Sequence, residues 1–219
     1  QSVAYDVRFG YAQRCADGET VSGDSCVVTK IDLSHRLLAV CDGMGNGVQA
    51  HAESSAAAGL IANFYRAGFA REAALRAVNR LLLLRSGEEM YSTVDLCIFD
   101  CAQGACQWTK IAAAPGLLRK NGRIHLVQTE ALPMGVADTD VPDALTFQLH
   151  EGDGVLLFSD GVTDAVGEAA LVSLCDALWH DCGADAQALC DAVLEAALAC
   201  GGGAAADDMS VAAGILVRS

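Results

Sequence analysis

Residues 36–50 read RLLAVCDGMGNGVQA. The apolar run 36–41 is typical of a short strand, and Asp42 with the alternating glycines behind it predicts a turn. Beyond the turn, apolar residues recur at helical spacing from 48 to 66, and a second helical pattern covers 71–84. This segment therefore predicts a strand that leads directly into a pair of helices.

The rest of the chain alternates between strand-like and helical patterns. Turn residues separate the strand-like runs 5–12 and 25–32 from the strand at 36–41, so we expect the first forty residues to form a meander. Two more helices are expected at 168–181 and 184–200. The other strand-like runs, two pairs of which are joined by hairpin turns at 103–104 and 121–122, are 93–101, 105–113, 117–119, 124–128, 145–150, 154–159 and 209–217. This order predicts an α+β fold layered on antiparallel sheets, and no repeat or linker divides 1–219, so we expect a single domain.

Composition excludes several classes of partner. The net charge is −14, which disfavours nucleic acid and anionic lipid surfaces, and the hydrophobic content of 53% is typical of a globular core rather than a disordered chain. The longest apolar stretches fall short of a membrane span, and residues 1–7 do not have the pattern of a signal peptide. We expect the sequence to begin inside a longer protein, so that any membrane contact comes from segments outside this chain.

The ten cysteines indicate core packing rather than metal binding or disulfides. They contain no Cys-x-x-Cys pair, and most lie within apolar runs, where a free thiol packs as a small hydrophobe. Free core thiols predict a reducing compartment. The five histidines are scattered without the spacing of metal ligands.

Acidic residues stand at the ends of four predicted strands: Asp24, Asp42, Asp160 and the pair Asp207-Asp208. One Asp-Gly turn alone would mean little, because this dipeptide is common in turns. If the four strand ends meet at one rim, however, their carboxylates form an all-oxygen cage, which suits Mg²⁺ or Mn²⁺.

Two rival interpretations of residues 42–47 fit less well. A calcium loop would have Met44 at its third ligand position and a strand, not a helix, before it. A dinucleotide fingerprint at Gly45-x-Gly47-x-x-Ala50 would require a strand and an acidic residue after the helix, where a second helix is expected instead.

Six motifs in order resemble those of the bacterial metal-dependent (type 2C-like, PPM) serine/threonine protein phosphatases, above all phosphatase domains of the stage II sporulation protein E type. The resemblance covers nearly the whole chain and implies an α-β-β-α sandwich of two antiparallel sheets flanked by helix pairs. The motifs lie at 21–25, 42–47 with Ala50 and Glu53, 84–96, 132–135, 159–164 and 207–211.

The resemblance also implies a site with two Mn²⁺ or Mg²⁺ ions. Asp42 would bridge them, the Gly43 carbonyl would bind one, and Asp160 and Asp207 would complete one site, while Asp24 would support it through water. Asp207 matches the motif better than Asp208, and the choice between them stays open. The implied reaction is hydrolysis of a phosphoserine or phosphothreonine ester by a metal-bridging water, without a protein nucleophile.

The sequence departs from the wider family in two places. Some relatives carry a further Asp for a third metal where this chain has Ala112-Ala-Ala-Pro115, so Asp164 lacks a companion and a third ion is not expected. A phosphate-binding arginine has no clear counterpart, and Arg14 is a weak candidate. In sporulation-type relatives the helices corresponding to 48–84 act as a switch that completes the metal site, which makes such a role a hypothesis here.

As a partner, the resemblance implies a phosphorylated anti-anti-sigma factor, whose dephosphorylation leads to sigma-factor activation in sporulation. It implies a cytoplasmic domain, in some relatives of a membrane-anchored parent, and leaves a homodimer open. Two alternatives remain: a pseudophosphatase that binds a phosphoprotein without turnover, and a small-molecule phosphatase.

Overall fold

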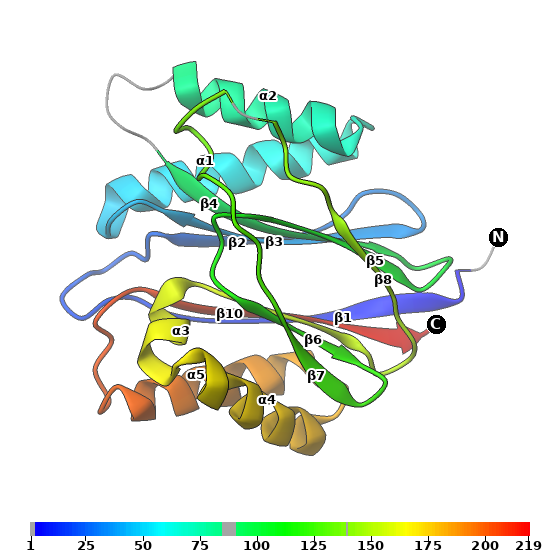
Figure 1. Ribbon diagram of the computed structural model, residues 1–219, viewed down its shortest axis with the longest axis vertical. Helices are drawn as coiled ribbons and strands as arrows, with labels where there is room; N and C mark the ends of the chain where they lie inside the picture. Colours follow the sequence, from blue (N-terminus) through cyan, green and yellow to red (C-terminus); the bar gives the residue numbers. More distant parts are fainter. Residues whose placement is uncertain (1–2, 85–90, 139) are drawn as a thin grey trace.

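The computed structural model describes residues 3–84, 91–138 and 140–219, and within them two five-stranded antiparallel sheets stack face to face (Figure 1). One sheet has the order β1-β10-β9-β6-β7 and the other β2-β3-β4-β5-β8. The strands are β1 (Tyr5–Arg14), β2 (Asp24–Lys30), β3 (His35–Gly43), β4 (Ser92–Asp100), β5 (Ala105–Ile111), β6 (Gly116–Lys120), β7 (Arg123–Val127), β8 (Leu145–Gln148), β9 (Gly154–Phe158) and β10 (Met209–Arg218).

Helices cover both outer faces of the sandwich, which gives the expected α-β-β-α layers. Helices α1 (Gly47–Arg66) and α2 (Arg71–Leu84) lie on the sheet that contains β3, and α4 (Glu168–Cys182) and α5 (Ala186–Cys200) lie on the sheet that contains β10 (Figure 1). A short helix α3 (Asp160–Val166) precedes α4. Within the described part of the chain, every helix is too short or too polar to cross a bilayer.

Three apolar clusters hold the four layers together. The central one lies between the sheets and includes Val40, Trp108 and Leu157, all at most 3% exposed. The outer two pack α1–α2 and α4–α5 against their sheets, with Ile61 and Trp179 fully buried. All ten cysteines are free thiols, and six of them are buried, as the sequence predicted for most of them.

Two expectations about the fold were wrong. Residues 5–43 do not form a meander, because β1 pairs with β10 in one sheet while β2 and β3 form a hairpin in the other. The nine residues between β1 and β2 are long enough to cross between the sheets, and strand periodicity does not specify a partner. The helix α3 was also missed, because its opening Asp160-Gly161 was interpreted as a turn. Of the motif at 84–96, residues 85–90 lie outside the described residues.

The acidic strand ends do meet at one rim. Asp24 starts β2 and faces Asp42 in the β2–β3 register, so both carboxylates stand at the same end of one sheet. In the other sheet, β10 begins directly after Asp208, and its neighbour β9 ends just before Asp160. Because β9 and β10 are antiparallel, the end of one and the start of the other share an edge.

Candidate metal-binding and catalytic site

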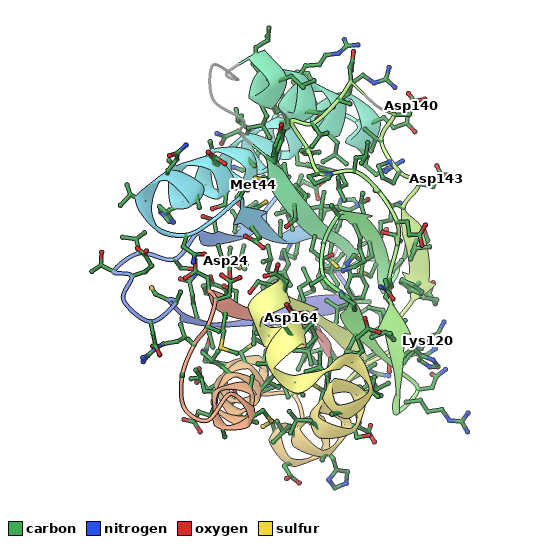
Figure 2. All side chains as sticks on the ribbon, turned by 60° about the vertical axis from the view of Figure 1, so that its left-hand side comes forward. Asp24, Met44, Lys120, Asp140, Asp143 and Asp164 are labelled. Atoms are coloured by element: carbon green, nitrogen blue, oxygen red, sulfur yellow. The ribbon has the colours of Figure 1, made fainter. Side chains whose placement is uncertain are left out.

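A cavity of about 220 Å³ opens at this rim and is shared by both sheets. Asp42 and Gly43 line it from the end of β3, Asp160 from the start of α3, and Asp207 from the turn before β10. Figure 2 shows the face on which Asp24, Met44 and Asp164 surround this end of the sandwich. The other lining residues are Met44, Gly45, Asn46, Tyr91, Ser92, Thr93 and Pro133.

Asp24, which is buried, and Asp42, which is half-buried, form an acidic pair. Asp24 is only 2% exposed, and burial raises its pKa to about 6, against the opposing effect of the Ser210 and Ser159 hydroxyls. Burial, followed by the facing Asp24 and then Asp160, raises the pKa of Asp42 to about 8. Oδ2 of Asp24 is buried and has no hydrogen-bond partner. Two carboxylates held this closely in a low-dielectric environment favour either a shared proton or a bound cation.

Asp160 and Asp207 stand at the open side of the cavity. Both side chains are exposed to solvent. The partial loss of hydration of the Asp160 carboxyl, followed by the charge of Asp207, raises the pKa of Asp160. In the amide orientation that satisfies both partners, Asn46 Nδ2 donates to Asp207 Oδ1 at 3.0 Å. This contact links the start of α1 to the β10 turn across the cavity.

Asp208 points away from the cavity, into the body of the protein. Its carboxylate is 3% exposed and accepts hydrogen bonds from the backbone N–H groups of Ala16, at 2.8 Å, and Gly23, at 2.6 Å. It therefore fixes the connection that carries Asp24, whereas Asp207 lines the cavity.

Two glycines of the predicted motifs allow backbones to come close at the rim. A Cβ on Gly43 would lie 2.1 Å from the carbonyl oxygen of Ala50 in α1, and one on Gly161 would lie 2.3 Å from the carbonyl oxygen of Asp208. Both contacts are with backbone, which cannot move aside as a flexible side chain can. Glycine at these positions therefore lets α1 and α3 pack directly against the strand ends.

Two hydroxyls of β4 hold Asp42 in place, and reasoning from the residues did not assign them a role. Thr93 Oγ1 accepts a hydrogen bond from the Asp42 N–H at 3.2 Å, and Ser92 Oγ donates to the Asp42 carbonyl at 3.1 Å. The sequence feature that could have identified them is their position in the motif at 84–96, and β4 pairs with the end of the strand that carries Asp42.

The oxygen donors that line the cavity have the chemistry of a divalent-cation site, but their side chains do not converge on a single point. Carboxylates and the Gly43 carbonyl offer only oxygen ligands, which suits Mg²⁺ and Mn²⁺, and the unpartnered Oδ2 of Asp24 lies behind them. Within residues 3–84, 91–138 and 140–219, no three His, Cys, Asp or Glu side chains stand close enough to hold an ion as they are. The exposed Asp160 and Asp207 have the freedom to turn inward, because neither is buried.

Arg14, the weak candidate for a phosphate-binding arginine, and Asp164, the residue without a companion for a third metal, both lie outside the cavity lining. Arg14 ends β1, is exposed, and pairs with Asp17 at 3.3 Å. Asp164 is exposed on α3. Among the described residues, no arginine or lysine lines the cavity.

Comparisons with known proteins show the family of the chain. The family model described as stage II sporulation protein E (SpoIIE) matches residues 34–214. Stage II sporulation protein E of Bacillus subtilis (strain 168) is 32% identical over 159 residues, which are 73% of this chain and 19% of that protein. The chain thus spans about a fifth of the length of this curated relative.

Solved structures share the fold. The PP2C phosphatase domain of SpoIIE from Bacillus subtilis, solved with a fragment of its regulatory domain, superposes with a TM-score of 0.89 at 28% identity and covers 100% of this chain and 66% of that one. A structure of RsbX in complex with magnesium superposes with a TM-score of 0.73 at 15% identity over 99% of this chain and 98% of that one, and it shows the fold alone.

Proposed function

This chain belongs to the stage II sporulation protein E family, and on that basis we propose that it is a metal-dependent phosphatase that hydrolyses phosphoserine or phosphothreonine esters on a protein. The observation that carries the proposal is the convergence of Asp42, Asp160, Asp207 and the Gly43 backbone on one cavity at the rim of the two sheets. The oxygen donors that line this cavity suit a divalent cation, and RsbX, which has the same fold, was solved in complex with magnesium.

In this proposal Asp42, the Gly43 carbonyl, Asp160 and Asp207 would hold two Mn²⁺ or Mg²⁺ ions. When bound, these cations would supply a water of lowered pKa and offset the charge that develops on the phosphoryl group. The chain's own residues orient this arrangement. Thr93 and Ser92 fix the Asp42 backbone, and Asp24 lies behind the Asp42 carboxyl in the paired strand.

The proposed substrate is a phosphorylated anti-anti-sigma factor, by the family relationship. In this proposal the chain is the cytoplasmic catalytic domain, residues 1–219, of a longer protein, whose membrane contacts lie in other segments, and a homodimer of the chain stays open. The family match over residues 34–214 supports the assignment of one catalytic domain to this stretch.

The test is a phosphoserine phosphatase assay of Asp42→Ala with manganese. Activity should fall to background, because the shared ligand is lost. Asp176→Ala is a matched control, since it removes an exposed carboxylate from α4, on the outer face of the other sheet, and should leave turnover unchanged. Full activity of the Asp42→Ala protein would refute the mechanism.

A second candidate function is a binding module that recognises a phosphoprotein without turnover. Calorimetry with manganese separates the two functions: binding that is lost in Asp42→Ala supports the phosphatase, and no binding to the wild-type protein supports the module. A small-molecule phosphatase would instead hydrolyse an aryl phosphate rapidly and leave phosphoproteins intact.

A further inference from the structure

A second cleft, of about 290 Å³, lies beside the catalytic cavity, between α2 and the connection from β7 to β8. Pro133 lines both, so the two hollows share a wall. Figure 2 labels Asp140, at the rim of this cleft, beside α2 and above Met44 of the catalytic cavity. The other lining residues are Leu75, Asn79, Ile111, Glu130, Ala131, Leu132, Met134, Val141 and Pro142.

The connection that forms one wall is fixed to α2 by side chains. The Asn79 amide donates to the Ala137 carbonyl at 2.9 Å and accepts from the Gly135 N–H at 2.8 Å. Arg71 Nη1 donates to the Pro142 carbonyl at 2.6 Å. Three separate hydrogen bonds therefore attach the middle and the β8 end of this wall to α2, which makes the cleft a part of the fold.

The same wall is joined to the catalytic rim. Met134 and Ser92 exchange backbone hydrogen bonds of 2.9 and 3.1 Å. Ser92 is also the residue whose hydroxyl donates to the Asp42 carbonyl. A ligand in the cleft is thus held in a fixed relation to the carboxylates of the cavity.

The chemistry of the cleft is apolar with an acidic rim. Leu75, Ile111 and Met134 form its buried floor, and Leu132 stands 55% exposed at its mouth. The Asn79 amide already has partners in the wall. Glu130 and Asp140 supply the charge, with Arg76 3.7 Å from Asp140, and among the described residues no lysine or arginine lines the cleft itself. Such a site accepts a bulky apolar side chain and repels a carboxylate.

We propose that this cleft is a specificity subsite, which takes an apolar side chain close in sequence to the phosphoserine of the protein substrate. The proposal rests on the proposed function, since it places the phosphoserine in the neighbouring cavity. An extended peptide advances about 3.3 Å per residue, so a side chain within a few positions of the phosphoserine passes over Pro133 into the cleft. Because the cleft adjoins the cavity that would bind the phosphoserine, we assign the cleft to a neighbouring segment of the same substrate.

The experiment uses phosphoserine peptides in which Leu, Ala or Asp stands in turn at each of the four positions on either side of the phosphoserine. With the manganese-loaded protein, Leu should raise kcat/KM about tenfold or more over Ala at one or two positions, and Asp should lower it there. Leu and Ala peptides within twofold of each other at every position would overturn the proposal.

A variant ties the preference to the cleft. Leu132→Glu should lower the ratio of kcat/KM for the preferred Leu peptide to that for an aryl phosphate, and Leu132→Ala should lower this ratio less. Leu33→Glu is the matched control, because Leu33 is 78% exposed in the β2–β3 turn, and it should leave the ratio unchanged. An equal ratio in Leu132→Glu and wild type would place the preference elsewhere and refute the subsite. If the wild-type protein hydrolyses none of the peptides, the proposed function itself fails, and this result is distinct from hydrolysis without preference.

Discussion

Replacing Asp42 by Asn should stabilise the metal-free protein at neutral pH while it abolishes activity. In the wild-type fold, the Asp42 carboxyl is partly buried and faces Asp24, and its pKa is about 8 instead of 3.8. At pH 7, ionising this carboxyl or keeping it protonated therefore costs free energy in the folded state, whereas the carboxyl ionises without this cost in the unfolded chain. An Asn side chain has nearly the same shape and carries no such cost.

The sign and size of the effect follow from the two pKa values. The folded state binds the proton more tightly, so the stability of the metal-free wild type is greatest below pH 4 and declines as pH rises through the range from about 4 to about 8. At pH 7 the raised pKa of Asp42, to which the facing Asp24 contributes, sets an upper bound of about 4 kcal/mol, at about 1.4 kcal/mol per pH unit above the ordinary pKa. At pH 5 the same reasoning leaves less than about 2 kcal/mol.

The measurement is urea unfolding of wild type and Asp42→Asn in the presence of a chelator, at pH 5 and pH 7. The variant should be the more stable at both pH values, with a larger difference at pH 7. Saturating manganese should reverse the order, because two ions, each at a hundred times its dissociation constant, together add about 5.4 kcal/mol to the protein that binds them, which exceeds the cost of the Asp42 carboxyl. A variant no more stable than wild type at pH 7 without metal would refute the reasoning.

Three further predictions concern the framework of the site. Lys110→Met should destabilise the fold by about 3–5 kcal/mol in urea unfolding, because it leaves Asp95, 1% exposed and paired with Lys110 at 2.5 Å, as an uncompensated buried charge; adding Asp95→Leu should recover much of the loss, and a double variant as unstable as the single one would contradict this. Gly43→Ala should lower the melting temperature and weaken manganese binding in calorimetry, because the new Cβ would lie 2.1 Å from a backbone oxygen of α1; unchanged stability would show that α1 can move away freely. Asp207→Asn should weaken manganese binding more than Asp208→Asn, which should instead cost about 1–3 kcal/mol of stability through its two backbone hydrogen bonds; the reverse order in calorimetry would exchange their roles.

The rim of acidic residues could be predicted because each one follows a local rule. Asp42 and Asp160 each stand between a strand and a Gly, Asp24 begins a strand, and Asp208 directly precedes one. Antiparallel pairing then brings the end of β3 beside the start of β2 in one sheet, and the end of β9 beside the start of β10 in the other. Helices such as α2 have a strong apolar period and were predicted with the same ends that the structure shows, Arg71–Leu84.

The features that were not predicted depend on contacts between distant parts of the chain. The sheet to which β1 belongs is decided by pairing with β10, which lies about 200 residues away. The inward turn of Asp208 depends on backbone N–H groups of residues 16 and 23, which nothing in its own neighbourhood reveals. Burial also separates residues that the sequence treats alike, since Asp24 is enclosed while Asp160 is exposed.

The net charge of −14 takes on a different meaning with the site and the cleft in view. Two divalent cations at the rim would change it only to about −10, but they would place the positive charge where a phosphate must bind. Arginines near the cleft do not add to this attraction, because Arg71 bonds the Pro142 carbonyl, Arg76 lies 3.7 Å from Asp140, and Arg80 pairs with Asp138 at 3.2 Å. They build the wall of the cleft instead of offering a cation to a substrate. If the proposed function and the proposed subsite hold, an acidic phosphoprotein would be repelled at long range and held at short range, by metal at its phosphate and by apolar contact beside it. Discrimination among substrates would then rest on the fit of that neighbouring side chain.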